Sequence, residues 1–503
     1  MSRFNATQVS GFLLVISIYI AARMWGLTAS CLWFDEIFSI HAAEHPWNSI
    51  LSFVALDLIH PPLFYLLLKA WMSIGGDGLM WLRSLPAVLS FVAIVPFLGI
   101  CRELRLNGWA GLLALFLFSV NGSMIKYAQE VRMYSLLLCL SLFSIWFFAR
   151  YFNRGGTILP LLVVNVLLVH THYFGWFVVA SQLTAVIWLH HKQWRPVAAM
   201  AAVVGLAFLP WAAAVWKASG TGTGLSQNIG WMSRPGAGEL AVFLLNLVEP
   251  FYFQTSSAEA ASFYFVSVPL VILILAAAVS HFAVRAESSI ERRHLQLLSL
   301  FVLIPIFAAF AASWVMPYSI WGTRHLTLVF APFAVMLGVL VTSLRPSYLS
   351  RVAVGVMLLL AAAGFASRAL RTPAEYSWCA WEPLTASANA DAPIYFFEDL
   401  VAYHVWFALR KENAASVIKA SGIQGLTEDK AYFLPRGFDS VKSADLADIE
   451  DRRLWLAFRS SSVSDSESPL RNFLVKGYAV AERRIMRAGA EDAALILMEK
   501  VDQ

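Results

Sequence analysis

Residues 295–316 read LQLLSLFVLIPIFAAFAASWVM, a run of 22 residues without a charged side chain. Such a run is long enough to cross the hydrocarbon core of a bilayer as an α-helix, which needs about 20 apolar residues. Comparable runs recur at residues 11–29, 263–284 and 352–366. Each must be helical, because lipid offers the backbone no hydrogen-bonding partner. The pattern predicts an α-helical polytopic membrane protein.

The composition agrees with this interpretation. Of the 503 residues, 59% are hydrophobic and 14% are charged, whereas soluble domains carry about a quarter charged residues. The net charge is +5, but the basic residues stand in short clusters between apolar runs. That distribution reflects membrane topology rather than nucleic-acid binding, and we expect no nucleic-acid partner. The four cysteines, Cys31, Cys101, Cys139 and Cys379, lack metal-binding spacing, so we expect buried free thiols.

Basic residues set the predicted topology, because Lys and Arg are enriched in cytoplasmic loops. We therefore place inside, with the N-terminus, the clusters at residues 102–105, 150–154, 192–195, 285–293 and 345–351. Residues 31–60 contain four acidic residues and no Lys or Arg, and they are placed outside. An odd number of crossings must then connect residue 60 to residue 102. The shorter stretch 62–74, which contains Lys69, is therefore predicted to lie in the membrane plane.

The remaining apolar stretches alternate across the membrane and give about 11 crossings. The predicted spans are residues 11–29, 85–100, 110–124, 134–149, 158–169, 173–189, 197–216, 262–284, 295–316, 325–343 and 352–369. Residues 217–261 form a long outer loop with a second in-plane helix at 239–253. We thus predict a membrane domain at 1–371, whose first outer loop is 30–78.

From residue 372 the composition becomes mixed. Strand-like stretches occur at 392–397, 454–458 and 493–498, with polar segments between them. Residues 372–503 are therefore predicted to form a soluble domain of α/β type. The odd number of spans places this domain outside the cytoplasm.

Ionisable and polar residues gather at the predicted outer ends of the spans. They are Asp35, Glu36, Asp57, His60, Lys126, Gln129, Glu130, Arg132, Tyr134, His170, His172, Arg324 and His325. Each type has an ordinary explanation: an acidic pair can be a solvated turn, arginines can extend to lipid headgroups, and the His170–His172 spacing does not fit zinc. Charges held at a membrane are costly, however, and their joint placement on one face indicates a functional site.

This set suits glycosyl transfer from a polyprenyl phosphate sugar. A carboxylate at an apolar surface can act as a general base, which assigns catalysis to Asp35, with Glu36 as the alternative base. Guanidinium groups grip phosphate and offset the charge on a leaving phosphate, so Arg132 and Arg324, with Lys126, are the predicted donor-phosphate ligands. The sequence contains no glycine-rich nucleotide motif.

The other residues of the set are assigned to the substrate pocket. These residues are Asp57, His60, Gln129, Glu130, Tyr134, His172 and His325. The cofactor is unknown; a divalent cation held by Asp35, Glu36 or Glu130 is an open alternative.

Several short motifs occur in a characteristic order. They are Trp33-Phe34-Asp35-Glu36, His60-Pro61-Pro62-Leu63-Phe64-Tyr65, Arg83-Ser84-Leu85-Pro86, Gln129-Glu130-Val131-Arg132-Met133-Tyr134-Ser135, Thr171-His172-Tyr173-Phe174-Gly175, Leu209-Pro210-Trp211 and Arg324-His325-Leu326. Residues 10–345 thereby resemble bacterial relatives of the dolichyl-phosphate-mannose protein mannosyltransferases. They are also similar to the branch with lipid A aminoarabinose and rhizobial galacturonosyl transferases. The segment from residue 372 onward shows no such resemblance.

The resemblance implies a GT-C fold, a catalytic aspartate at Asp35 and a donor-phosphate arginine at Arg132. It further implies an inverting glycosyltransferase in the inner membrane of a bacterium, with its active site on the extracytoplasmic side. Such an enzyme moves a sugar from an undecaprenyl-type phosphate to a glycan, lipid or protein of the cell envelope. The sequence names neither the sugar nor the acceptor.

Three alternatives remain. A transporter or flippase for lipid-linked sugars would place ionisable residues near the bilayer midplane, within paired repeats, and we find no internal repeat. A non-catalytic membrane scaffold would need neither the Asp35-Glu36 pair nor the arginines. A glycan ligase with a diphosphate-linked donor is a close chemical neighbour.

Overall fold

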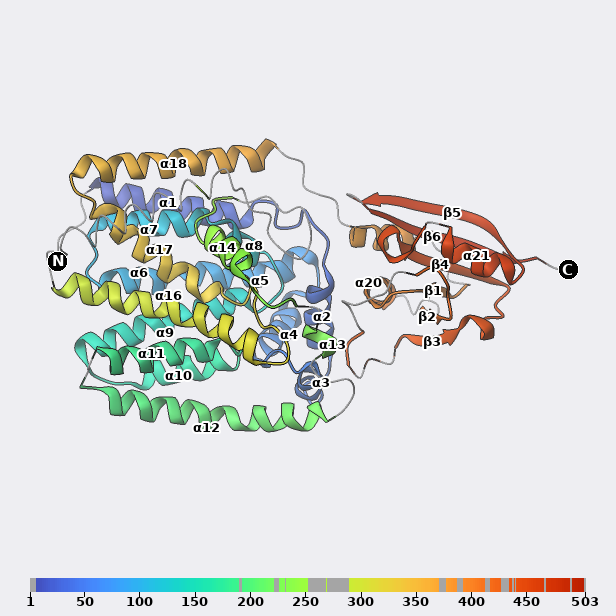
Figure 1. Cartoon of the computed structure of the whole chain (residues 1–503), viewed down its shortest axis with the longest axis horizontal. Helices are drawn as coiled ribbons and strands as arrows, with labels where there is room; N and C mark the ends of the chain where they lie inside the picture. Colours follow the sequence, from blue (N-terminus) through green and yellow to red (C-terminus); the bar gives the residue numbers. More distant parts are fainter. Residues whose placement is uncertain are drawn as a thin grey trace. The chain divides into compact units, whose positions relative to one another are not determined.

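The computed structural model describes two long stretches of the chain. These are residues 6–251 except 190–191, 221–225 and 231, and residues 289–501 except 371–376, 387–391, 412–416, 427–433, 437, 439, 466 and 489–490, together with residue 268. The chain divides into two compact units (Figure 1). The helical unit comprises residues 1–27, 46–218 and 232–372, and the sheet unit comprises residues 28–45, 219–231 and 373–503.

The helical unit is a bundle of apolar helices. Its described helices are α1 (Ala6–Met24), α3 (Ile50–Asp57), α4 (Leu63–Gly75), α5 (Leu79–Val92), α6 (Ile94–Glu103), α7 (Gly108–Val120), α8 (Gly122–Tyr127), α9 (Tyr134–Arg154), α10 (Leu159–Val169), α11 (Gly175–Trp188), α12 (Trp194–Ser219), α14 (Ala237–Asn246), α16 (Ser289–Val315), α17 (Thr327–Thr342) and α18 (Ser347–Leu370). Many run roughly parallel to one another in Figure 1.

Six helices of the described chain are long and apolar enough to cross a membrane. They are α1, the α5–α6 pair (Leu79–Glu103), α9, α12, α16 (within Arg293–Val315) and α18. The shorter apolar helices α7, α10, α11 and α17 fall on four further predicted spans. The prediction of a polytopic α-helical membrane protein is confirmed. The count of about 11 crossings stays a prediction, and the predicted span at 262–284 lies outside the described residues except for residue 268.

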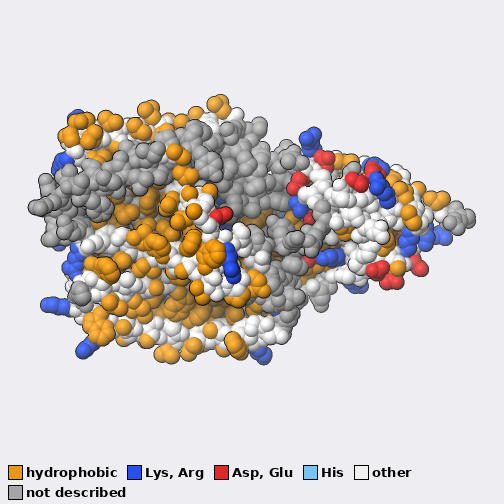
Figure 2. Space-filling model, in the orientation of Figure 1, with side chains coloured by type: hydrophobic (Ala, Val, Ile, Leu, Met, Phe, Trp, Pro, Cys, Tyr) orange, Lys and Arg blue, Asp and Glu red, His pale blue; other side chains and the backbone are white. Residues whose placement is uncertain are grey.

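The helical unit has an apolar surface, and its helices are joined inside by hydrogen bonds, as is typical of membrane proteins. Figure 2 shows hydrophobic side chains spread over the face of the unit that it presents, and Trp188, Leu206 and Trp216 are among the exposed ones. Inside, fully buried polar side chains bond one another. Asn165 on α10 accepts a hydrogen bond from Ser144 on α9 (2.6 Å) and donates one to Gln182 on α11 (2.8 Å). Such bonds fasten helices together where water is absent.

Helices form at both segments that were predicted to lie in the membrane plane, with different bounds. Helix α4 has 13 residues, or about 20 Å, and its in-plane placement stays a prediction. The indole rings of Trp71 and Trp81 stack at 4.5 Å and fix α4 to α5. Helix α14 ends at Asn246, before the predicted end at residue 253. Beyond the helix, Pro250 forms a β-bridge with Asn121.

The sheet unit contains a six-stranded sheet covered by helices. The strands are β1 (Ile394–Phe396), β2 (Val417–Ser421), β3 (Lys442–Asp445), β4 (Arg453–Arg459), β5 (Tyr478–Ala488) and β6 (Glu491–Lys500), in the order β3-β2-β1-β4-β6-β5. Strands β1 to β4 are parallel, and β6 is antiparallel to both β4 and β5. The helices are α2 (Phe34–Glu44), α13 (Ser226–Ile229), α19 (Trp381–Ala386), α20 (Asp399–Leu409) and α21 (Ser468–Val475).

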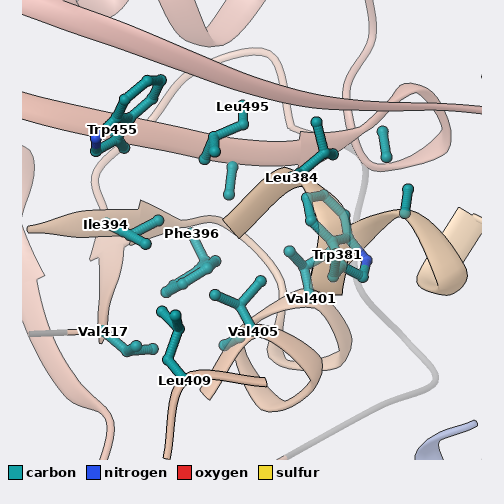
Figure 3. Close-up of a cluster of buried hydrophobic side chains, with 14 of the residues drawn as sticks. Trp381, Leu384, Ile394, Phe396, Val401, Val405, Leu409, Val417, Trp455 and Leu495 are labelled. Atoms are coloured by element: carbon teal, nitrogen blue, oxygen red, sulfur yellow. The ribbon is translucent and has the colours of Figure 1, made fainter. Parts of the chain in front are cut away.

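Apolar side chains cover both faces of the sheet, as parallel sheets require. On one face, Trp381 and Val405 from the helices pack with Phe396 of β1 (Figure 3). On the other face, Leu456 of β4 belongs to a cluster with Phe473 of α21. The prediction of a C-terminal domain of α/β type is confirmed.

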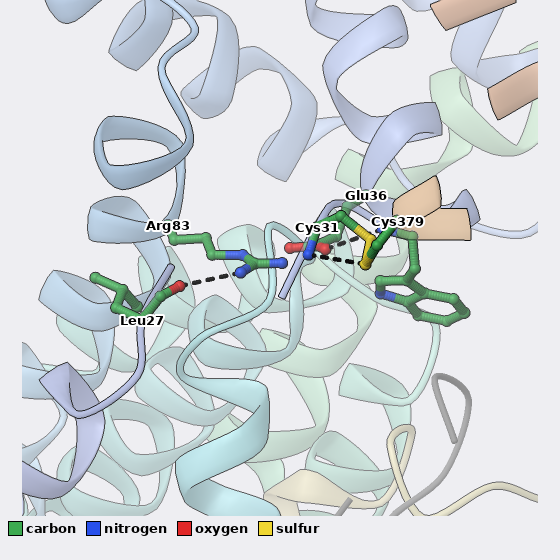
Figure 4. The surroundings of a disulfide bond; sticks show 6 residues. Leu27, Cys31, Glu36, Arg83 and Cys379 are labelled. Carbon is green, nitrogen blue, oxygen red and sulfur yellow. Dashed lines mark hydrogen bonds between the residues drawn. A yellow bond between two sulfur atoms is a disulfide. The ribbon is translucent and has the colours of Figure 1, made fainter. Parts of the chain in front are cut away.

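The expectation of four free cysteines is wrong. Cys31 and Cys379 form a disulfide across a sequence separation of 348 residues (Figure 4). The spacing pattern could not reveal this bond, because tertiary structure alone brings such distant residues together. Cys101 and Cys139 are buried free thiols, as expected.

Candidate active site

The predicted acidic pair lies on α2 and so belongs to the sheet unit. Asp35 stands in the first turn of α2 and is partly exposed. Glu36 is fully buried, and its carboxylate accepts a hydrogen bond from the backbone N–H of Trp33 (3.3 Å). This contact caps the helix that carries both residues. Glu36 thus has a structural role, and Asp35 is the better placed candidate base.

The end of α8, the start of α9 and the segment between them hold five of the predicted residues in the helical unit. The ammonium group of Lys126 lies 3.6 Å from the carboxylate of Glu130, and both are buried. The side-chain amide of Gln129 donates to the backbone carbonyls of Arg23 and Trp25, each at 2.9 Å. Gln129 therefore ties this segment to the end of α1.

Three predicted histidines converge from separate loops. The ring of His172 lies 5.5 Å from that of His60 and 5.4 Å from that of His325. The His325 ring in turn lies 6.5 Å from that of Tyr134, the first residue of α9. His60 also contacts Asp57, with 3.3 Å between the imidazole and the carboxylate. Residues that are far apart in sequence, and that the sequence analysis selected separately, are thus neighbours in the structure.

The two arginines predicted to hold phosphate act electrostatically on this histidine cluster. Arg132 and Arg324 are both buried. Burial, followed by the charges of His60, Arg132 and Arg324, holds the pKa of His172 well below its ordinary value. The His172 ring is therefore neutral at physiological pH, and both guanidinium charges act on it.

The hydrogen bonds of His172 fix its tautomer. Its Nδ1 accepts the backbone N–H of Phe174 (3.1 Å), so the proton resides on Nε2. That buried Nε2–H has no hydrogen-bonding partner among the described residues. An unsatisfied buried donor is unfavourable, and it marks a place for an acceptor group. With the charges of two buried arginines acting there, the cluster suits an anion.

An apolar cavity of about 540 Å³ lies in the same unit, among α1, α7 and α18. Trp25, Val120 and Phe365 are among its lining residues. Its end at Trp25 adjoins the active-site segment, because the Trp25 carbonyl accepts the hydrogen bond from Gln129. The cavity lies within a size range that suits small ligands.

Arg23 and Glu249 are among the buried charged residues that the sequence analysis did not single out. Arg23, fully buried on α1, donates to the hydroxyl of Ser90 (2.9 Å) and to the carbonyl of Ser119 (3.0 Å), and it joins α1, α5 and α7. Glu249 follows α14 and is 1% exposed. The signal for Arg23 was present, because a charge inside an apolar run is unusual. Glu249 lies in a segment that contains both polar and apolar residues, where a carboxylate is not unusual.

A third such residue, Arg83 on α5, belonged to a quoted motif but had no predicted role. Its guanidinium donates to the carbonyl of Leu27 at 3.0 Å (Figure 4). It therefore fixes the end of the segment that leads out of α1. Among the described residues, no group of three or more histidine, cysteine, aspartate or glutamate side chains is arranged to hold a metal.

Comparison with known proteins identifies the fold. No protein-family model matches the sequence, and no curated protein is similar enough in sequence to count as a relative. ArnT from Cupriavidus metallidurans bound to undecaprenyl phosphate superposes with a TM-score of 0.57 at 12% identity, over 98% of each chain. The fold is GT-C.

Two further structures agree with this fold. The apo form of the same ArnT has a TM-score of 0.58 at 12% identity, over 97% of this chain and 98% of its own. The apo oligosaccharyltransferase of Archaeoglobus fulgidus has a TM-score of 0.50 at 12% identity, over 81% of this chain and 64% of its own. The ArnT match extends over nearly the whole chain, so the GT-C likeness includes residues after 372, where the sequence motifs gave no resemblance.

Proposed function

We propose that the chain is an inverting glycosyltransferase that uses a polyprenyl phosphate sugar as donor. The observation that carries the proposal is the buried, unsatisfied Nε2–H of His172 in the helical unit, on which the charges of the buried Arg132 and Arg324 act. A lipid phosphate would accept the hydrogen bond from His172 and would be attracted by both guanidinium groups. The GT-C fold supports the proposal, since an ArnT of this fold binds undecaprenyl phosphate.

The residues suggest a single displacement at the anomeric carbon. Asp35 takes the proton of an acceptor hydroxyl, whose oxygen forms a bond to C1 of the sugar. The bond from C1 to the phosphate oxygen breaks, and its electron pair leaves with the phosphate. Arg132 and Arg324 then stabilise the negative charge that grows on the phosphate. The apolar cavity beside Trp25 is suited to part of the polyprenyl tail.

We place the sheet unit and the active site on the extracytoplasmic side of a bacterial inner membrane. The distribution of Lys and Arg supports this placement. The disulfide between Cys31 and Cys379 supports it independently, because disulfides persist in oxidising compartments and are rare in the cytosol. The acceptor is then a glycan, lipid or protein of the cell envelope.

Donor titration tests the proposal. Arg132→Lys and Arg324→Lys should each raise the KM for the donor about tenfold or more, because Lys cannot reproduce the two-pronged contact of a guanidinium with phosphate. The double variant should lose less than the product of the single losses, since the two groups share one ligand. The assay uses purified protein and a panel of polyprenyl phosphate sugars.

A matched control lies on the same helix as the candidate site. Arg154, in the last turn of α9, pairs with Glu103 through contacts of 2.8 and 2.7 Å and is largely exposed. Arg154→Lys should leave the donor KM unchanged. If Arg132→Lys and Arg324→Lys also keep the wild-type KM, these residues do not bind the donor phosphate. The phosphate site would then have to be sought at Lys126, Lys217 or Arg234.

A further inference from the structure

The helix that carries Asp35 is fastened to the sheet unit at its N-terminal end. Cys31 precedes α2 and is bonded to Cys379, which lies in a short 3₁₀ turn (Ser377–Ala380). The backbone N–H of Cys31 also donates to the sulfur of Cys379 (3.4 Å; Figure 4). The turn itself packs against β5 and β6. A covalent bond therefore anchors the start of α2 to the edge of the sheet.

The middle of α2 packs on α20. The ring of Phe34 lies 5.1 Å from that of Tyr403, and Nδ1 of His41 is 2.9 Å from the Tyr403 hydroxyl. The His41 ring also lies 4.7 Å from the ring of Trp406 and 5.4 Å from that of Phe438. His41 thus sits in an aromatic cage that the sheet unit provides.

An ion pair holds the C-terminal end of α2. The guanidinium of Arg410, just after α20, contacts both carboxylate oxygens of Glu44, with the shortest distance at 2.8 Å. The Arg410 side chain is 14% exposed and lies over the ring of Phe407, which restricts its motion. The pair is therefore better ordered than an ordinary surface ion pair, which contributes little.

The contacts of α2 lie outside the described hydrophobic clusters of the sheet. The buried residues of its two hydrophobic clusters all lie between residues 380 and 498. Helix α2 has only 11 residues, and an isolated helix of that length is marginal in water. Helix α2 therefore takes its position from its contacts with residues 373–503, and the described clusters of the sheet include no residue of α2.

We propose that residues 373–503 act as the positioning element of the candidate base, with Cys379, Tyr403 and Arg410 as positioning residues for Asp35. The inference rests on the proposed function, because it assigns Asp35 to the reaction. A general base must stand within hydrogen-bonding reach of the acceptor hydroxyl. A misplacement of about 1 Å can cost about 100-fold in rate. Three attachments along about 16 Å of helix provide that accuracy.

The test compares variants of the full chain in detergent or nanodiscs. Arg410→Gln should lower kcat about tenfold with an unchanged donor KM, because it displaces the base without touching the phosphate ligands. The exchanged pair Glu44→Arg with Arg410→Glu should recover most of the lost kcat. The double variant Cys31→Ser with Cys379→Ser should lower kcat further. Rates are expressed per folded molecule. If the contacts of α2 only stabilised the fold, the kcat of the folded molecules would stay unchanged.

A second readout does not depend on activity. Hydrogen exchange of residues 34–44 should accelerate at least tenfold in Arg410→Gln, and by a larger factor than that of β4 and β6. Arg483→Gln is the matched control, because Arg483 forms an equally short ion pair with Glu467, away from α2 (2.7 Å). This control should change neither the exchange of residues 34–44 nor kcat.

The outcomes separate the two proposals. Slower turnover with faster exchange of α2 in Arg410→Gln supports the positioning role. An active wild type whose Arg410→Gln variant keeps its kcat overturns that role and leaves the proposed function intact. A wild type that transfers no sugar from any polyprenyl phosphate donor, with α2 still protected in a way that depends on Arg410, overturns the proposed function instead.

Discussion

Acidification should loosen the sheet unit through His41. Burial, aided by the charges of His45 and Arg410, lowers the pKa of His41 from 6.5 to about 3. Between these two pH values the unfolded chain binds a proton that the folded chain does not bind. The free energy of unfolding therefore falls as the pH drops below about 6.5, and this loss levels off below about pH 3. At pH 5.0 the loss amounts to about 2 kcal/mol, from about 1.5 pH units at 1.36 kcal/mol each.

Replacement of His41 isolates this contribution. His41→Gln removes the titrating ring and retains a polar group beside Tyr403. His404 on α20 titrates as well, since burial lowers its pKa to about 4, but it is present in both proteins. The wild type should lose about 2 kcal/mol more than the variant between pH 7.5 and pH 5.0.

Native-state hydrogen exchange of β1 and α20, corrected for the intrinsic pH dependence of exchange, measures this free energy for the sheet unit alone. The reasoning would be refuted by equal losses in the two proteins. A larger loss in the variant would refute it too.

Three other predictions follow from the structure and the proposed reaction. Asp35→Asn should reduce transfer by about 10²- to 10⁴-fold without impairing donor binding; near-normal turnover would exclude Asp35 as the base. A phosphatase reporter fused after Gln503 should be active and a cytoplasm-specific reporter silent, and the reverse pattern would overturn the topology. Asn165→Leu, which removes the central member of the buried polar network, should destabilise the helical unit by about 1 kcal/mol; an unchanged unfolding midpoint in detergent would show that the network is not a staple.

The membrane part of the fold could be predicted because lipid restricts the chain so strongly. An apolar run such as 295–316 has one solution in a bilayer, a helix, and α16 includes nearly all of it. The meeting of His60, His172 and His325 could be anticipated as well. Residues at the same ends of helices must share one membrane surface, and the Lys and Arg clusters together with parity predict which residues these are.

The sheet unit was harder to predict, because its strands differ in burial. The predicted stretches at 392–397, 454–458 and 493–498 fall on β1, β4 and β6, which are continuous apolar runs. Strands β3 and β5 carry many charged or exposed side chains. An edge strand such as β3, with the sequence KSAD, has no pattern that distinguishes it from a polar loop.

The assignment of α2 to the sheet unit could not be predicted from the sequence. The run from Cys31 to Glu44 lies between two segments of the helical unit, so local reasoning assigns it to the membrane domain. Its true neighbours, Cys379, Tyr403 and Arg410, lie more than 300 residues away along the chain. A disulfide, an aromatic contact and an ion pair leave no local trace when their partners are so distant. These tertiary contacts place the acidic pair in the sheet unit.

The two proposed roles belong to residues of different units. The candidate phosphate ligands, Arg132 and Arg324, belong to the helical unit, whereas the candidate base, Asp35, is carried by a helix that the sheet unit holds. Donor affinity and acceptor activation are then properties of different parts of the chain. Changes in the sheet unit should then lower kcat, through the position of the base, while the donor KM stays unchanged.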